Sequence, residues 1–382
     1  MEWQRSEDHR QLAQLELLAV EGTRRAPRAV GAWLNLAAIY RLRGSAQDVE
    51  SCLDAAAAIV CGDPEGHTAL AAEILALGEP DRALAELEQI LAASPDFAPA
   101  RRLLLTCLLA TTQYARAHAL TQDGVALDAA QVGALAMLRD VGTSAADMLV
   151  HCDAVLAREP HHVDAKYYKA IALAQLGRTA QARAVIALDD LVQTSVLPVP
   201  AAYGSGEAFR AALAAEMLSN PTLAADPRLR STRQGRQVAN LFLPQSRASL
   251  VLAAQIEEAV EAYLAAHKAV VAPARAKLVV WGVVLGAEGY QKSHRHPAGW
   301  LSGVTYVAAP KPPPANAYPG RLLLGALDHD PAALSAGWGV MEIEPVPGTL
   351  VIFPSHIPHS TEPSGMAQDR ISVAFDVVPL EW

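Results

Sequence analysis

The sequence of 382 residues is poor in cysteine and contains no long apolar run. Its four cysteines, Cys52, Cys61, Cys107 and Cys152, form no CxxC pair, which is typical of buried thiols in a reduced, cytoplasmic protein. No apolar stretch reaches the roughly 18 residues that a membrane span requires. Residues 1–10 are charged and lack the apolar core of a secretory signal. We therefore expect a soluble cytoplasmic protein that has no membrane partner.

Positive charge is scarce in the first half of the chain. Residues 1–195 carry 17 Lys and Arg against 25 Asp and Glu, whereas residues 196–382 carry 14 against 15. An acidic surface repels phosphates, so this half does not suit a nucleic-acid partner. It could bind a basic peptide, or it could be an ordinary solvated surface, and the composition leaves both interpretations open.

The first half also repeats itself. Gly44, Gly78 and Thr112 are spaced by 34 residues, and each is followed five positions later by a small or β-branched residue. A later unit has the same pattern at Gly177 and Ala182, and a degenerate unit is expected around 125–160. The glycine permits a tight turn between two helices, and the small residue lets these helices pack closely.

This pattern resembles the tetratricopeptide repeat, in which two antiparallel helices form each unit of 34 residues. We expect residues 1–195 to form an all-α superhelix of this type, with a helical array of another type as the alternative. Stacked repeats present a concave face that often binds a peptide or protein.

The pattern changes at residues 197–200, where proline and β-branched residues end the helical run. Helices are predicted at 206–219 and 246–268, and the second of these has apolar residues close to the helical period. Short strands bounded by Gly or Pro are predicted at 278–285, 302–307, 349–353 and 370–378. We expect residues 196–382 to form a second domain, with a double-stranded β-helix, or jelly roll, over about 276–382 and helices flanking it.

The candidate functional residues lie in this second domain. His294 and His296 are two positions apart, so on an extended strand both side chains share one face, and His359 follows at the end of a later predicted strand. Arg370 and Ser372 would share one face of the last strand. Three nitrogen ligands beside an arginine suit an open iron site with an anionic cosubstrate.

These stretches resemble the 2-oxoglutarate- and iron(II)-dependent oxygenases, and in particular a bacterial and phage branch in which tetratricopeptide repeats often precede the catalytic barrel. The resemblance covers about 196–382 and rests on residues 232–237, 289–297, 300–307, 347–355 and 370–376. It implies iron ligands at His294 and His359, and a 2-oxoglutarate carboxylate bound by Arg370 with help from Ser372 and Tyr306. It also implies a dioxygen-consuming hydroxylase. The repeats favour a peptide or protein substrate, as in the similarly built aspartyl/asparaginyl β-hydroxylases.

Several alternatives stay open at the level of sequence. The broad superfamily has Asp or Glu where this chain has His296, so either His296 is the third ligand or iron keeps two protein ligands. A missing carboxylate leaves halogenation possible beside hydroxylation, and the substrate could be a small molecule. A cupin-like metal protein, or a scaffold with an inactive barrel, is the further alternative, and an oligomer is possible. We expect His356 to be a pocket or surface residue and residues 328–330 to lie in a loop.

Overall fold

The computed structural model of the chain describes residues 1–3, 8–43, 45–60, 62–127, 133–225, 231–242, 246–311, 319–327 and 337–382. Contacts between Cα atoms divide the chain into two compact units, residues 5–151 and residues 1–4 together with 152–382. This division falls inside one helix, α9 (Ala145–Arg158). The domain boundary predicted at residues 195 and 196 stays a prediction.

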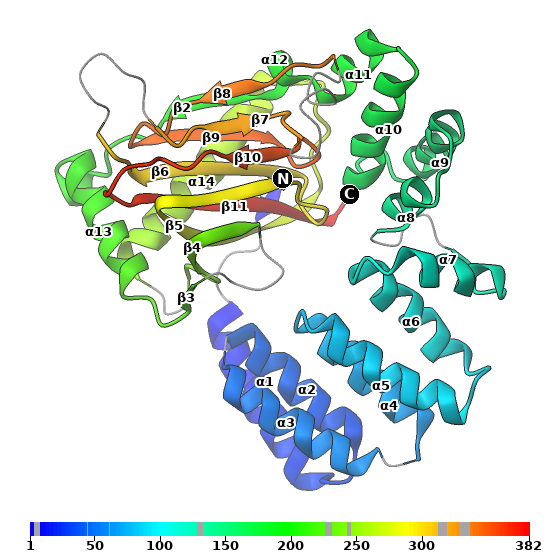
Figure 1. The fold of residues 1–382 in the computed structure, drawn as a ribbon. Coiled ribbons are helices and arrows are strands. Elements are labelled where there is room, and N and C mark those ends of the chain that lie inside the picture. The colour runs from blue at the N-terminus through cyan, green and yellow to red at the C-terminus, as the bar shows by residue number, and fades with distance from the viewer. Residues whose placement is uncertain are drawn as a thin grey trace. The chain divides into compact units, whose positions relative to one another are not determined.

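The first unit is a series of helices in which α2 packs on α3, α4 on α5 and α6 on α7 (Figure 1, blue to cyan). Proline at the first position starts α4 and α5, where the missing N–H costs no hydrogen bond. The helices are α1 (Asp8–Arg25), α2 (Val30–Arg43), α3 (Ala46–Ile59), α4 (Pro64–Ala76), α5 (Pro80–Ala93), α6 (Ala98–Ala110), α7 (Tyr114–Gln122), α8 (Ala134–Asp140) and the first part of α9.

The repeat pattern has the predicted structural meaning. Gly78 lies between α4 and α5 with φ +82°, in the left-handed region that glycine adopts without strain. Thr112 occupies the equivalent turn between α6 and α7 with φ +57°, although it carries a Cβ. The small residues Ala83 and Ala117 are fully buried, as close packing of the helices requires. The predicted all-α repeat array is confirmed, and Gly44 lies outside the described residues.

The thiols of Cys52, Cys107 and Cys152 are free and buried, as predicted. Burial raises the pKa of Cys52 and Cys107 to about 11 and that of Cys152 to about 12. These three thiols are therefore protonated core groups at neutral pH, and they lack the reactivity of a thiolate. Cys61 is outside the described residues.

The second unit contains a curled, mainly antiparallel sheet with helices around it (Figure 1). Its helices are α10 (Val163–Gln175), α11 (Thr179–Ile186), α12 (Leu188–Leu191), α13 (Gly206–Leu218) and α14 (Arg247–Ala266). Its strands are β1 (Glu2–Trp3), β2 (Gln193–Val196), β3 (Leu223–Ala225), β4 (Thr232–Val238), β5 (Arg275–His294), β6 (Leu301–Ala308), β7 (Leu322–Leu324), β8 (Met341–Ile343), β9 (Thr349–Pro354), β10 (His359–Thr361) and β11 (Arg370–Glu381). The predicted jelly-roll class with flanking helices is confirmed.

The long strand β5 connects the two parts of the sheet. The strand order is β2-β9-β6-β11-β5-β10-β7-β8. Residues 275–285 of β5 pair with β11, whereas Gln291 and His294 near its end pair with β10. One strand therefore lies against the strand of Arg370 along its first half and against the strand of His359 at its end.

Alternate residues of β11 face the hydrophobic core and the opposite side of the sheet. Val373, Phe375 and Val377 are fully buried and pack with apolar residues of α13 and α14. Arg370 and Ser372 point to the opposite face, as the two-residue period of a strand requires. None of the helices in the described ranges combines the length and the apolar character needed to cross a membrane.

Candidate metal and cosubstrate site

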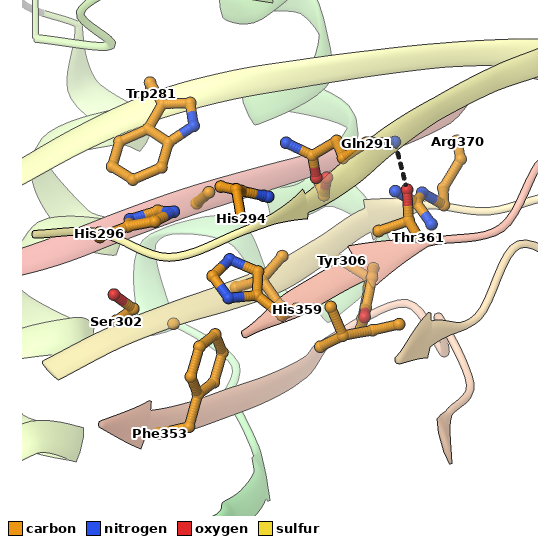
Figure 2. A pocket seen from close by; sticks show the side chains of 15 residues that line it. Trp281, Gln291, His294, His296, Ser302, Tyr306, Phe353, His359, Thr361 and Arg370 are labelled. Atoms are coloured by element: carbon orange, nitrogen blue, oxygen red, sulfur yellow. Dashed lines mark hydrogen bonds between the residues drawn. The ribbon is translucent and has the colours of Figure 1, made fainter. Parts of the chain in front are cut away.

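Three histidine side chains converge at one end of a pocket inside the curled sheet (Figure 2). The potential ligand atoms of His294, His296 and His359 all lie within 4.8 Å of one another. Their ring centroids are 4.2 Å apart for His294 and His359, 5.0 Å for His294 and His296, and 4.9 Å for His296 and His359. A cluster of this size could hold one metal ion.

The strand register brings two of these histidines together. His294 is the last residue of β5 and His359 is the first residue of β10, and the two are direct partners in the antiparallel pair. The sequence prediction placed His294 and His296 on one strand, but β5 ends at His294 and His296 follows in the connection to β6. The prediction also placed His359 at the end of the preceding strand, whereas a turn at 355–358 separates that strand from β10.

A hydrogen bond fixes the ring of each histidine. Nδ1 of His294 donates to the carbonyl of Lys292 over 2.8 Å, and Nδ1 of His359 donates to the carbonyl of Ile357 over 3.1 Å. Nδ1 of His296 donates to Oδ1 of Asp376 over 2.6 Å. Because these oxygens can only accept, each Nδ1 carries a proton, and Nε2 is the nitrogen of each ring that remains available to a metal. Nε2 of His294 also lies 3.2 Å from the hydroxyl of Ser231.

The protonation state of the cluster suits metal binding. Burial, together with the neighbouring His296, lowers the pKa of His294 to about 3. Burial also lowers the pKa of His359 well below its usual value, and His294 and His296 add to this effect. Both rings are therefore neutral at pH 7, and neutral imidazole is the form that binds a metal.

The opposite end of the pocket holds a buried arginine. Arg370 is 2% exposed, and its Nη1 donates to the carbonyl of Gly320. Tyr306 of β6 is equally buried, and it is the register partner of Ser372 on β11. Figure 2 shows Arg370, Tyr306 and Thr361 grouped at this end.

Two polar atoms at this end have no hydrogen-bond partner among the residues that the structure describes. They are Nε of Arg370 and the hydroxyl of Tyr306, and both are buried. A buried polar group of this kind costs about 1–3 kcal/mol if it stays unpaired. Burial raises the pKa of Tyr306 to about 12, so the phenol keeps its proton at pH 7. Burial lowers the pKa of Arg370, but a guanidinium stays charged in proteins at neutral pH. The arrangement is suited to a carboxylate, which would accept from both.

The structure brings all six predicted site residues to one pocket: His294, His296, His359, Tyr306, Arg370 and Ser372. Arg370 pairs with neither of the carboxylates that the sequence places near it, since Asp369 accepts from Arg236 and Asp376 from His296. Further residues of the site were not predicted from the sequence, and they include Trp281, Gln291, Ser302, Phe353, Thr361 and Asp376. The two-residue period from Arg370 through Ser372 was the available signal for Asp376.

The prediction that His356 is a pocket or surface residue is wrong. His356 is 5% exposed, and its Nε2 donates to the carbonyl of Val185 over 2.8 Å, away from the histidine cluster. The Ile357-Pro358 turn before β10 places it in the core of the unit. Residues 328–330 lie outside the described residues.

A second, wider cavity of about 650 Å³ reaches His294 and His296 from the side of β4. Its wall includes Trp281, Arg233 and Lys292. The histidine cluster therefore lies between a narrow buried pocket on the arginine side and a roomy cavity on the other side.

Two family models match segments of the chain. Residues 279–376 match the family model described as "Putative 2OG-Fe(II) oxygenase", and residues 75–140 match a tetratricopeptide repeat model. No curated protein sequence matches the chain.

Solved structures similar to the chain include a Pseudomonas putida prolyl-4-hydroxylase, with 18% identity and a TM-score of 0.36 over 51% of this chain and 97% of that one. A Trichoplax adhaerens prolyl hydroxylase in complex with a hypoxia inducible factor peptide fragment has 12% identity and a TM-score of 0.35 over 53% and 92%. HygX from Streptomyces hygroscopicus with nickel and 2-oxoglutarate has 13% identity and a TM-score of 0.36 over 51% and 87%.

Proposed function

Residues 279–376 form a domain of the 2-oxoglutarate- and iron(II)-dependent oxygenases, and from that premise we propose that the protein hydroxylates a side chain of a peptide or protein bound by its repeats. The protein is thus a dioxygenase with iron(II), 2-oxoglutarate and dioxygen as cofactor and cosubstrates. The identity of the ligands, the binding mode of 2-oxoglutarate and the class of substrate make up the proposal.

His294, His296 and His359 hold the iron in this proposal. Their ligand atoms are close enough to share one ion, and each Nδ1 is already used by an oxygen acceptor, which leaves Nε2 for the metal. Three protein ligands leave positions open for a bidentate cosubstrate and for dioxygen. His296, and not a carboxylate, is then the third ligand.

Arg370 holds the distal carboxylate of 2-oxoglutarate, with Tyr306 donating its hydroxyl and Ser372 beside it. The single observation that carries this assignment concerns two buried donors in the pocket of the three histidines, Arg370 Nε and the Tyr306 hydroxyl, for which the described part of the chain offers no partner. A charge-assisted bond from the guanidinium and a second bond from the phenol would satisfy both donors at once.

When bound, iron(II) and 2-oxoglutarate supply the oxidising chemistry that replaces an unactivated C–H bond with C–OH. The protein positions the metal and the cosubstrate and excludes water. Arg370 and Tyr306 orient the cosubstrate from one end, and the three imidazoles fix the metal at the other. Phe353 and Leu322 add apolar surface to the wall of the pocket, which would limit the access of water.

A macromolecular substrate follows from the repeat unit. Stacked helical repeats typically provide a binding face for a protein segment, and a small metabolite needs no such platform. The wider cavity beside His294 and His296 gives a substrate side chain an approach that does not pass the arginine end.

The test is incubation of the full-length protein with iron(II), 2-oxoglutarate, oxygen and candidate peptides, followed by mass spectrometry. We expect one peptide to gain a single oxygen atom in proportion to the succinate formed. Hydrogen exchange on the complex should then show protection in α4–α7. Oxidation of a small molecule, with no protection in those helices by any peptide, would contradict the assignment of a macromolecular substrate.

A further inference from the structure

Asp376 lies on the same face of β11 as Arg370 and Ser372. The strand alternates from Arg370 to Asp376, and its other residues, Ile371, Val373 and Phe375, lie in the core. The same strand that carries the arginine of the cosubstrate end therefore carries a carboxylate at the histidine end.

The carboxylate of Asp376 is held tightly against His296. Its Oδ1 accepts from Nδ1 of His296 over 2.6 Å and from the hydroxyl of Ser302 over 2.7 Å. The side chains of His296 and Asp376 are only 12% and 14% exposed, and such burial strengthens a hydrogen bond between charged or polar groups. Among the three histidines of the cluster, His296 is the one whose Nδ1 contacts a carboxylate, since the other two contact carbonyls.

The surroundings are shaped to keep this contact. The hydroxyls of Ser302 and Ser355 are 2.8 Å apart, and the backbone N–H of His296 donates to the carbonyl of Ser355 over 3.2 Å. A Cβ at Gly299 would lie 2.5 Å from Oγ of Ser355 and 3.3 Å from Cγ of Asp376, so glycine leaves the room that the network needs.

His296 depends on such support more than its partners do. His294 and His359 are held by the pairing of β5 with β10, whereas His296 lies beyond the end of β5. A loop residue has no strand ladder to fix its side chain. A strong hydrogen bond to Nδ1 can replace the missing restraint.

We propose that Asp376 is the positioning residue of the metal centre, which orients His296 with Nε2 toward the ion and lends it negative charge through the imidazole. This inference rests on the proposed metal site. Three neutral imidazoles leave a divalent ion without a counter-charge, and a carboxylate bonded to a ligand histidine raises the basicity of that ligand. Asp376 thus compensates for the absence of a carboxylate in the cluster itself.

The test is Co(II) binding to the metal-free protein, followed by the visible absorption of the ion and by competition with a chelator. Asp376→Ala should weaken Co(II) binding about 10- to 100-fold, which is the usual effect of removing such a partner. Asp376→Asn should fall between this variant and the wild type, because the amide oxygen still accepts from Nδ1 but carries no charge. The matched control is Asp369→Asn, which removes a carboxylate that pairs with Arg236 on the surface.

The tautomer of His296 gives a second readout, which is measured on the wild-type protein and so does not depend on the folding of a variant. Long-range ¹H–¹⁵N spectra of the wild-type protein should show the proton on Nδ1 of His296. Equal Co(II) affinity of Asp376→Ala and the wild type, or a proton on Nε2, would overturn the role of Asp376 and leave the proposed function standing. A wild-type protein that binds no Co(II) would overturn both proposals.

Discussion

Replacing Arg370 with methionine separates the effect of this buried arginine on stability from its effect on 2-oxoglutarate binding. Met fills a similar volume and carries no charge. Arg370 is 2% exposed, and within the described ranges it has one bond, to the carbonyl of Gly320, while its Nε has no partner. In the protein without cosubstrate, the variant exchanges one hydrogen bond for the removal of an unpaired buried donor. We expect the free energy of unfolding to change by no more than about 1 kcal/mol.

Binding of 2-oxoglutarate should respond very differently. Without the guanidinium, the distal carboxylate would be buried with no counter-charge, which costs about 2–5 kcal/mol. At about 1.4 kcal/mol per factor of ten, this loss raises the dissociation constant of 2-oxoglutarate by about 30-fold to several thousand-fold. The contrast between a large loss of affinity and a small change in stability is what distinguishes a binding residue from a structural one.

The assay is calorimetric titration of 2-oxoglutarate into protein loaded with Mn(II), beside urea unfolding of the metal-free protein. Arg236→Met is the matched control, because Arg236 pairs with Asp369 and its side chain is 44% exposed. The control should bind 2-oxoglutarate like the wild type. An unchanged dissociation constant for Arg370→Met would remove Arg370 from the cosubstrate site.

The remaining predictions concern the metal, a turn and the response to acid. His359→Ala should abolish Co(II) binding while His356→Ala retains it, and the reverse result would reassign the ligand. Thr112→Gly should raise the free energy of unfolding by up to about 1 kcal/mol, because glycine removes the strain of φ +57°, and a decrease would contradict this. Because burial lowers the pKa of His356 from 6.5 to about 4, the unfolded chain takes up this proton first as the pH falls. The stability that is present above about pH 6.5 is then lost toward about pH 4, and between about pH 7.5 and about pH 5 the loss is about 2 kcal/mol. Urea unfolding at both pH values should show that His356→Gln lacks this contribution, and an equal pH dependence in the variant would refute it.

The features that repeat locally could be predicted from the sequence. Spacing by 34 residues predicted the turns at Gly78 and Thr112, and apolar periodicity predicted α14. The alternation of β11 predicted that Arg370 and Ser372 share a face. These signals depend on neighbours along the chain, so they need no knowledge of how strands pair.

The contacts between distant strands could not be predicted in the same way. The pairing of His294 with His359 depends on the register of β5 with β10, and β10 exists because the chain turns after Pro354. That turn places His356 in the core beside Val185. The bond of Asp376 to His296 likewise joins the end of the chain to a loop that follows β5, and no local pattern specifies it.

In the proposed function, one cavity holds iron at the three histidines and 2-oxoglutarate between them and Arg370. The most direct measurement is the visible spectrum of the anaerobic protein with iron(II), before and after 2-oxoglutarate is added. We expect one iron per chain. We also expect a metal-to-ligand charge-transfer band that appears with 2-oxoglutarate and that requires a far higher concentration of it in Arg370→Met. A protein that binds one iron and shows no such band at any concentration of 2-oxoglutarate would contradict the proposed function.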